Sequence, residues 1–119
     1  MPHFVIDCSE HILSIQQEEQ IIREIHTVAV STGLFNENEI KVRVNPFKTY
    51  LVGNKKDDFI HVFSNIMEGR TTEQKASLSR AIVKQLVLLL PDLSNIAVNI
   101  REFEKSTYCN KDMLVNATF

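Results

Sequence analysis

The same order of extended and helical patterns occurs twice in this chain, and that repetition limits the fold more than any other feature. An extended run at residues 2–8 is followed by a helical pattern and by an alternating run at 40–44. A second extended run at 59–66 precedes another helical pattern and an alternating run at 95–101. Strand, helix and strand in succession form a right-handed crossover with parallel strands.

Two such units, at about 2–44 and 59–101, predict an α+β fold in a single domain over residues 1–119. We expect one four-stranded sheet with both helices on one face. The other face stays bare in a single chain, which favours a symmetric oligomer. The tail at 102–119 has only scattered apolar anchors, and we expect a short hairpin that packs on a neighbouring subunit.

Capping signals place the two helices. Ser14-Ile15-Gln16-Gln17 has the capping-box pattern and predicts that the first helix starts after Ser14, while Gly33 ends it. Thr71 and Gln74 form a second box before the other helix, and Pro91 stops that helix. Its apolar stripe is widened by further aliphatic residues, so we expect burial on more than one side: Val83, Val87, Leu88 and Leu90.

The run Ile40-Lys41-Val42-Arg43-Val44 alternates strictly, so Lys41 and Arg43 point to the same side of a strand. Asn45-Pro46 is expected to break or bend that strand. Residues 47–52 form a further extended run, which we expect to pair with 59–66 as a hairpin.

Composition excludes several classes of protein. The net charge of −2 offers no basic field for nucleic acid. No apolar run reaches the roughly 18 residues of a membrane span. Two cysteines, Cys8 and Cys109, are too few for a disulfide framework or a zinc site, so we expect no bound metal and reduced thiols in a cytoplasmic protein.

Pro2 has two interpretations that depend on one cleavage. With Met1 attached, its nitrogen is an amide, and proline simply opens the first strand. With Met1 removed, Pro2 carries a secondary amine that can accept a proton. The dipeptide alone favours the structural interpretation.

The stretch Pro2-His3-Phe4-Val5-Ile6-Asp7-Cys8-Ser9 resembles the start of the 5-carboxymethyl-2-hydroxymuconate isomerase family, within the tautomerase superfamily. Three further stretches are similar to the helix end, second strand and second crossover turn of that family: Thr32-Gly33-Leu34-Phe35, residues 40–44, and Gly69-Arg70-Thr71. The chain departs from the family pattern at Lys41 and Asp7, where arginine and glutamate are usual. The resemblance implies a homotrimer whose sheets face inward.

The resemblance also implies an activity. Members of the family convert an enol of a hydroxymuconate to its 2-oxo isomer without a cofactor. The implied base is the amine of Pro2, and the implied residues for a substrate with three carboxylates are Arg70, Arg43 and Lys41. Burial and neighbouring cations would lower the pKa of such an amine toward neutrality. His3, Asp7 and His61 are weaker candidates, as polar contacts at a subunit interface.

Two alternatives remain open at this point. Because lysine cannot grip a carboxylate with two parallel hydrogen bonds, Lys41 leaves room for a tautomerase or dehalogenase acting on a different acid. A non-catalytic interaction protein that keeps the fold is the second alternative. Retention of Met1 would favour the interaction protein, because the free amine would then belong to Met1 and not to Pro2.

Overall fold

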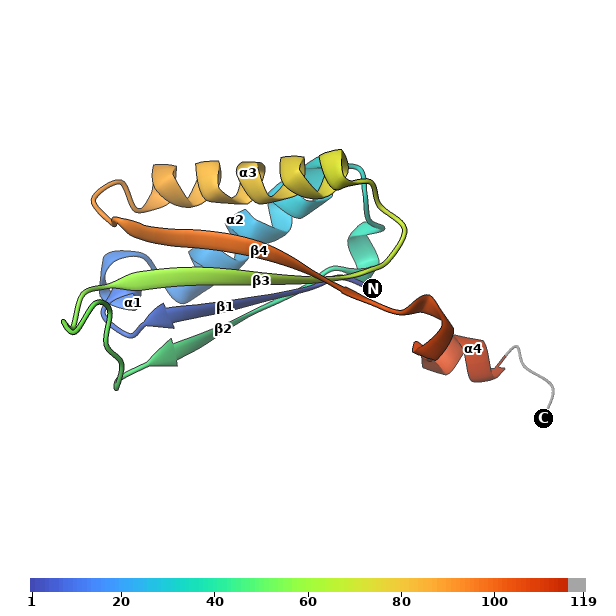
Figure 1. The fold of residues 1–119 in the computed structure, drawn as a ribbon, viewed down its shortest axis with the longest axis horizontal. Coiled ribbons are helices and arrows are strands. Elements are labelled where there is room, and N and C mark those ends of the chain that lie inside the picture. Colours follow the sequence, from blue (N-terminus) through green and yellow to red (C-terminus); the bar gives the residue numbers. More distant parts are fainter. Residues whose placement is uncertain (116–119) are drawn as a thin grey trace.

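The computed structural model describes residues 1–115 and contains one mixed sheet with two long helices on one face (Figure 1). The strands are β1 (His3–Ser9), β2 (Lys41–Phe47), β3 (Phe59–Met67) and β4 (Asn95–Phe103). The helices that cover the sheet are α2 (Glu18–Ser31) and α3 (Thr72–Leu89). Shorter elements are α1 (Ile12–Ile15), the 3-10 turns η1 (Glu37–Glu39) and η2 (Lys105–Thr107), and α4 (Lys111–Val115).

The strand order is β2-β1-β3-β4. Within each repeat the strands are parallel, β1 with β2 and β3 with β4, and the repeats join through antiparallel pairing of β1 with β3. The predicted pair of β-α-β units and the four-stranded sheet are therefore confirmed. Each repeat is a parallel pair, and the two repeats run in opposite directions because β1 and β3 are antiparallel. The starts of β1 and β2 therefore lie at the same end of the sheet as the ends of β3 and β4.

The core lies between the sheet and the two helices. Alternate residues of β1 are completely buried against the helices, namely Phe4, Ile6 and Cys8. Alternation in β3 buries Ile60, Val62, Ser64 and Ile66 on the same side. The helices contribute Ile21, Ile25 and Ala29 from α2 and Leu78, Ile82 and Leu86 from α3. The opposite face of the sheet, here called the open face, carries the intervening residues.

The two capping predictions had different outcomes. Thr71 accepts a hydrogen bond from Gln74 N at 3.1 Å, and Gln74 returns one to Thr71 N at 2.9 Å, so that box is confirmed. The box at Ser14 is wrong: the Ser14 hydroxyl donates to His11 O at 2.6 Å, within the separate short helix α1. The helix α2 starts after Gln17, whose side chain makes no capping bond. Gly33 ends α2 at φ 71°, as predicted.

Two predictions about extended segments were also wrong. Pro46 does not break β2, which runs on to Phe47 with Pro46 opposite Cys8. An edge strand tolerates proline because one side of it needs no donor. Residues 47–52 form no hairpin with β3, whose antiparallel partner is β1; Val52 instead bridges to Lys55.

Helix α3 is buried on fewer sides than expected. Leu90 is buried, but Val87 is 46% exposed and Leu88 is 67% exposed on the outer surface of the helix. The stripe at Leu78, Ile82 and Leu86 faces the core, and Leu89 packs against it in part. No helix in residues 1–115 combines the length and the apolar character needed to cross a membrane.

The C-terminal segment forms η2 and α4 in place of the expected hairpin, as far as the described part of the chain extends; residues 116–119 lie outside it. We call residues 104–115 the C-terminal arm. The arm continues from the end of β4 and projects away from the sheet (Figure 1), which gives the molecule a long axis of 54 Å against 28 and 25 Å. Its apolar side chains Met113, Leu114 and Val115 are exposed.

Candidate active site

The amino terminus lies at the end of the sheet where β1 begins (Figure 1). Pro2 is buried, and its carbonyl accepts a hydrogen bond from Lys41 N at 3.1 Å, which continues the parallel pairing of β1 with β2. Met1 is half-buried beside it. The backbone that carries Pro2 is thus fixed by a neighbouring strand.

Charged residues surround this end of the chain. Burial lowers the pKa of the Met1 amino group, and the positive charges of Arg70 and Lys41 lower it further, whereas Glu39 opposes the shift. Lys41 Nζ lies 3.8 Å from Met1 Sδ, and Arg70 lies over the ring of Phe35, which packs against Phe4 in β1. The structure therefore places Lys41 and Arg70, two of the three cations proposed from the sequence, near Met1, the residue before Pro2.

Lys41 is held by local contacts. Its ammonium donates to Glu39 O at 2.8 Å and lies 3.8 Å from Met1 Sδ. Lys41 and Arg43 are on the open face, since Val42 and Val44, which alternate with them along the strand, pack against the core. The alternation predicted for this strand is confirmed.

Arg70 connects the two crossover turns. Its guanidinium donates to Met67 O at 3.2 Å and to Leu34 O at 2.8 Å, and it lies 5.0 Å from the centroid of the Phe35 ring. Phe35 in turn packs edge-on against Phe4 at 5.9 Å. A guanidinium has five N–H donors, so these two bonds leave others for a ligand.

Arg43 lies against His3 on the open face, with Arg43 Nη1 3.0 Å from His3 Nδ1. Burial lowers the pKa of His3, and the charges of Arg43, Lys41 and the amino terminus lower it further. Since arginine can only donate, Nδ1 must be the acceptor, and the proton of a neutral His3 ring is on Nε2. His3 thereby positions Arg43, a role that the sequence pattern did not assign.

These cations have no acidic partner in the part of the chain that the structure describes. Within residues 1–115, neither Lys41, Arg43 nor Arg70 has a carboxylate oxygen within 4.0 Å of its side-chain nitrogens. Further polar pairs occupy the open face: His61 and Asn99 at 2.6 Å, and Asp7 and Asn45 at 3.2 Å. The three candidate cations are therefore not bound to a carboxylate in the described residues, which leaves them available to an anionic ligand.

Sequence reasoning missed the residues that the C-terminal segment brings to this end. Asn65 at the end of β3 and Phe103, Glu104 and Tyr108 border a cavity that also includes His3 and Arg43. Their positions depend on where β4 ends and on how the C-terminal arm turns. No local sequence pattern predicts either feature.

Comparison with known proteins identifies the family. The family model described as 5-carboxymethyl-2-hydroxymuconate isomerase matches residues 2–114. The 5-carboxymethyl-2-hydroxymuconate Delta-isomerase of Escherichia coli is 26% identical over 77 residues. That alignment covers 63% of this chain and 61% of the relative, so the chain spans about three fifths of that protein's length.

Solved structures share the fold. A 5-carboxymethyl-2-hydroxymuconate isomerase from Deinococcus radiodurans R1 superposes with a TM-score of 0.81 at 18% identity, covering 92% of this chain and 88% of that one. A fused 4-OT, described as an asymmetric trimer, superposes with a TM-score of 0.78 at 12% identity, covering 92% of each chain. Given the family match over nearly all of the described residues, this chain belongs to the 5-carboxymethyl-2-hydroxymuconate isomerase family.

Proposed function

We propose that this protein is a cofactor-independent isomerase of aromatic-acid catabolism. It converts 5-carboxymethyl-2-hydroxymuconate, or a closely related unsaturated hydroxy acid, to the 2-oxo isomer. Family membership supports the isomerase class, and the site supports an anionic substrate. The observation that carries the proposal is the buried start of β1, with Arg70 and Lys41 close to the terminal amine and no carboxylate bound to either within residues 1–115.

The proposed base is the amine of Pro2 after removal of Met1. The amine takes the hydroxyl proton from the enol oxygen, the electron pair shifts along the conjugated diene, and a proton is returned to carbon. The product has the same formula as the substrate, so no oxidant, reductant or cofactor is required. A base of this kind works best when its pKa lies near the working pH. We expect burial and the two cations, which lower the pKa of the Met1 amine against the opposing charge of Glu39, to favour the neutral form of a Pro2 amine as well.

The proposed carboxylate-binding residues are Arg70, Arg43 and Lys41. Arg70 precedes the N-terminus of α3, whose helix dipole also favours an anion. Lys41 next to the amine supplies a single point charge that stabilises negative charge developing on the enol oxygen. Because a lysine grips a carboxylate less specifically than an arginine, a related acid is the alternative substrate within the same reaction class.

We also propose that the protein is a homotrimer. The open face carries side chains that a partner sheet could cover, including Phe63, which is stacked on His61 at 4.4 Å and lies under Arg101 at 4.6 Å. The fused 4-OT structures described as trimers have the same fold. Light scattering should give three times the chain mass of 13.7 kDa, and a mass of one chain would contradict the assembly. The exposed thiol of Cys109 suits the reducing cytoplasm, where we place the protein.

The test monitors ketonisation of the enol by its ultraviolet absorbance. The absence of Met1 is first established by intact mass. We expect Pro2→Ala, which replaces the rigid secondary amine by a more mobile primary amine, to lower kcat by roughly tenfold or more. Pro91→Ala, an exposed proline beyond the far end of α3, is the matched control and should retain full activity. Full activity of Pro2→Ala would show that the secondary amine of proline is not required. No activity in any Met1-free preparation, with this enol or related acids, would favour a non-catalytic interaction protein.

A further inference from the structure

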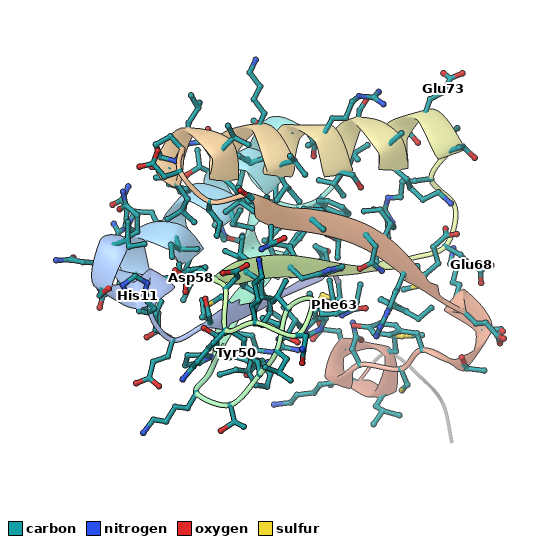
Figure 2. The ribbon with its side chains drawn as sticks, turned by 60° about the vertical axis from the view of Figure 1, so that its left-hand side comes forward. His11, Tyr50, Asp58, Phe63, Glu68 and Glu73 are labelled. Atoms are coloured by element: carbon teal, nitrogen blue, oxygen red, sulfur yellow. The ribbon has the colours of Figure 1, made fainter. Side chains whose placement is uncertain are left out.

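Contacts from separate parts of the chain hold the side chain of Arg70. Arg70 lies in the turn between β3 and α3, at the end of the molecule where Figure 2 shows Glu68 and Glu73. Its guanidinium donates to two backbone carbonyls, at 3.2 Å within its own turn and at 2.8 Å to Leu34 O in the turn after α2. The same group lies over the ring of Phe35, with Cζ 5.0 Å from the ring centroid. Two carbonyls and one aromatic side chain therefore fix where the guanidinium lies.

The ring of Phe35 connects Arg70 to the strand that carries Pro2. Phe35 is half-buried and packs edge-on against Phe4, with 5.9 Å between the ring centroids and 76° between the planes. Phe4 is completely buried in β1, two residues after Pro2. A continuous row of contacts thus runs from the start of β1 through two rings to the guanidinium.

The turn that presents Phe35 is fixed by its own hydrogen bonds. Thr32 Oγ1 donates to Ala29 O at 2.7 Å and accepts from Leu34 N at 3.3 Å. Gly33, between them, adopts a φ of 71°, which residues with a side chain rarely adopt. Phe35 therefore has a defined position that does not depend on a ligand.

The contact between Phe35 and Arg70 is directional. A cation is attracted to the face of an aromatic ring, where the negative part of the ring quadrupole lies. An aliphatic side chain of similar volume fills the same space but offers no such attraction. The side chain at position 35 therefore determines how firmly the guanidinium is held beside the start of β1.

We propose that Phe35 is a positioning residue for Arg70, and that its ring sets the distance between the guanidinium and the proposed base. The proposal rests on the proposed function and deepens it, because it names what holds Arg70 in the arrangement that the reaction needs. Similarity to the family singled out Phe35 only as part of the stretch that ends the first helix, with no role of its own.

Several charged groups lie around the terminal amine, and each must be counted before the effect of Arg70 is measured. Burial lowers the pKa of the amine, Glu39 raises it, and Arg70 and Lys41 lower it. His3 is the next titratable group along β1; burial lowers the pKa of its ring, as do the charges of Arg43, Lys41 and the amino terminus. Among these groups, Arg70 is the one that lies against Phe35.

Loss of the Phe35 ring should therefore reach the amine through Arg70. When the ring no longer holds the guanidinium, the positive charge of Arg70 acts on the amine less strongly, and the pKa of the amine rises. The effect should disappear when the residue at position 70 carries no charge. Simple loss of packing at position 35 has no such dependence on Arg70.

The test measures the pKa of the amine by nitrogen-15 NMR of labelled Pro2 in the Met1-free full chain, which requires no substrate. We expect Arg70→Met and Phe35→Leu each to raise this pKa, whereas Phe35→Tyr, which keeps the ring, should stay near wild type. In the Arg70→Met background, Phe35→Leu should cause no further rise. Phe47→Leu, which also loses an aromatic pair but at the far end of β2, should leave the pKa unchanged.

Three results would overturn the role of Phe35. They are an unchanged pKa in Arg70→Met, an unchanged pKa in Phe35→Leu, and an equal rise in Phe35→Leu with and without the charge of Arg70. Because the first needs no change at Phe35, the proposal can be tested even if Phe35→Leu does not fold.

Kinetics separate this proposal from the proposed function. If the protein ketonises no enol, the proposed function fails, while the titration of the amine still decides the role of Phe35. If ketonisation occurs, we expect Phe35→Leu to lower kcat/KM by roughly three- to tenfold, the effect of losing one cation–π contact. Phe35→Tyr should keep nearly full activity, and an equal loss in both variants would contradict a role for the ring face.

Discussion

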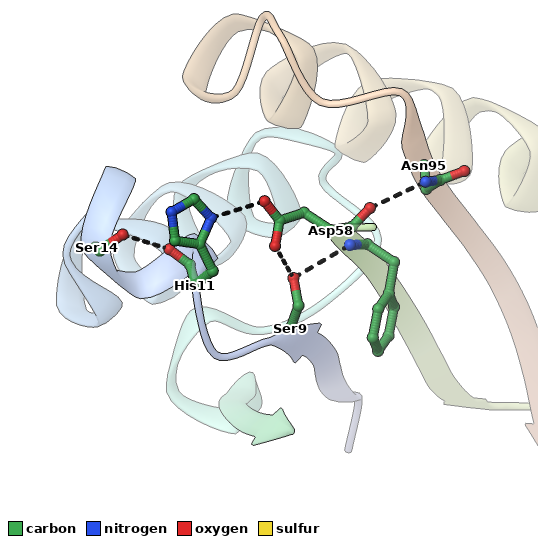
Figure 3. A network of polar contacts seen from close by, with 6 residues as sticks. Ser9, His11, Ser14, Asp58 and Asn95 are labelled. Carbon is green, nitrogen blue, oxygen red and sulfur yellow. Dashed lines mark hydrogen bonds and ion pairs between the residues drawn. The ribbon is translucent and has the colours of Figure 1, made fainter. Parts of the chain in front are cut away.

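The end of the sheet near Ser9 differs from the end near Pro2 in how its polar side chains are satisfied. Near Ser9, the Asp58 carboxylate bonds to the Ser9 hydroxyl at 2.8 Å and to His11 Nδ1 at 2.7 Å, while Asn95 donates to Asp58 O at 3.0 Å (Figure 3). The Ser9 hydroxyl also accepts from Phe59 N at 3.2 Å. Each labelled residue there makes at least one hydrogen bond within the chain.

At the Pro2 end, Lys75 pairs with Glu102 at 2.8 Å, but within residues 1–115 the three candidate cations have no carboxylate partner. Arg70 bonds to backbone carbonyls, Arg43 to a neutral histidine and Lys41 to a carbonyl, and none reaches a carboxylate within the described residues. Figure 2 shows the two ends apart, with His11 and Asp58 on one side and Glu68 on the other. Bringing like charges together without counter-charges costs stability, and such cost is typical of functional sites. The comparison teaches that the first network stabilises the fold, whereas we propose that the second group of charges binds an anionic ligand.

Among single substitutions that affect the two ends, the largest effect is expected when Arg70 is changed. Arg70→Lys keeps the charge but cannot reach both carbonyls and a substrate carboxylate at once. We expect kcat/KM to fall by roughly tenfold to a hundredfold, and the free energy of unfolding to fall by about 1–3 kcal/mol as Met67 O and Leu34 O lose their donor. Steady-state kinetics and urea unfolding measure the two effects. Arg80→Lys, on the exposed surface of α3, is the control. Unchanged kinetics would show that Arg70 only holds the turns together.

A stability effect of similar size is expected at the opposite end. Burial acts to raise the pKa of Asp58, but the hydrogen bonds from His11 and Ser9 and the charge of His11 outweigh it, so the pKa is lowered. A lowered pKa means that the ionised carboxylate stabilises the fold above its ordinary pKa of ~3.9, and that this contribution is lost as pH falls through the folded value. We expect Asp58→Ala to cost about 1–3 kcal/mol at pH 7, with less difference from wild type in strong acid.

Urea unfolding as a function of pH checks this expectation. Asp57→Ala removes the exposed carboxylate next in sequence and should cost under about 0.5 kcal/mol. Because Asp58 lies far from Pro2, its loss should leave kcat/KM at 25 °C unaltered. A loss of activity in folded Asp58→Ala would contradict the proposed division of roles, in which the Ser9 end stabilises the fold and the Pro2 end binds the substrate.

A smaller effect is expected on the pH profile. Lys41→Met removes a positive charge that helps to keep the terminal amine neutral, so the pKa of that amine should rise. The ascending limb of kcat/KM against pH should therefore shift to higher pH, while Lys84→Met on the surface of α3 should not shift it. A shift to lower pH would contradict the assigned sign.

The smallest expected effect concerns the two helix starts, one at each end. Thr71→Ala removes a hydroxyl that caps α3 and should cost about 1 kcal/mol. Ser14→Ala also removes a hydroxyl, but this hydroxyl donates to His11 O within α1 and caps no long helix. The cost should stay below about 0.5 kcal/mol. Thermal unfolding distinguishes the two values, and equal costs would mean that the Ser14 turn matters as much as a true cap.

Much of the fold was predictable because hydrophobic period reports burial directly. Alternation located β1 through β4, and the apolar stripe located α2 and α3. The predictions failed where tertiary position overrides local pattern. Pro46 sits in an edge strand that accepts it, and the aliphatic residues Val87 and Leu88 face outward from α3. The Ser14 pattern occurs at a single helical turn that the sequence does not distinguish from a long helix.

The candidate site was predictable only in part, and for a different reason. Similar stretches of sequence singled out Pro2, Lys41, Arg43 and Arg70, and the structure places Arg70 and Lys41 near the amino terminus. The partners of these residues were not predictable. His3 orients Arg43 through a cross-strand contact, and Tyr108 reaches the cavity because the arm turns after β4. Contacts between residues so distant in sequence leave no periodic signal.

The most direct test of the account compares two preparations of the same sequence, one with Met1 and one without it, as established by intact mass. Ketonisation of 5-carboxymethyl-2-hydroxymuconate is then measured at one protein concentration. We predict that the Met1-free protein is faster by at least ~100-fold, because only there is the nitrogen of Pro2 a base. Equal rates in the two preparations would contradict the central claim that the amine of Pro2 carries the proton.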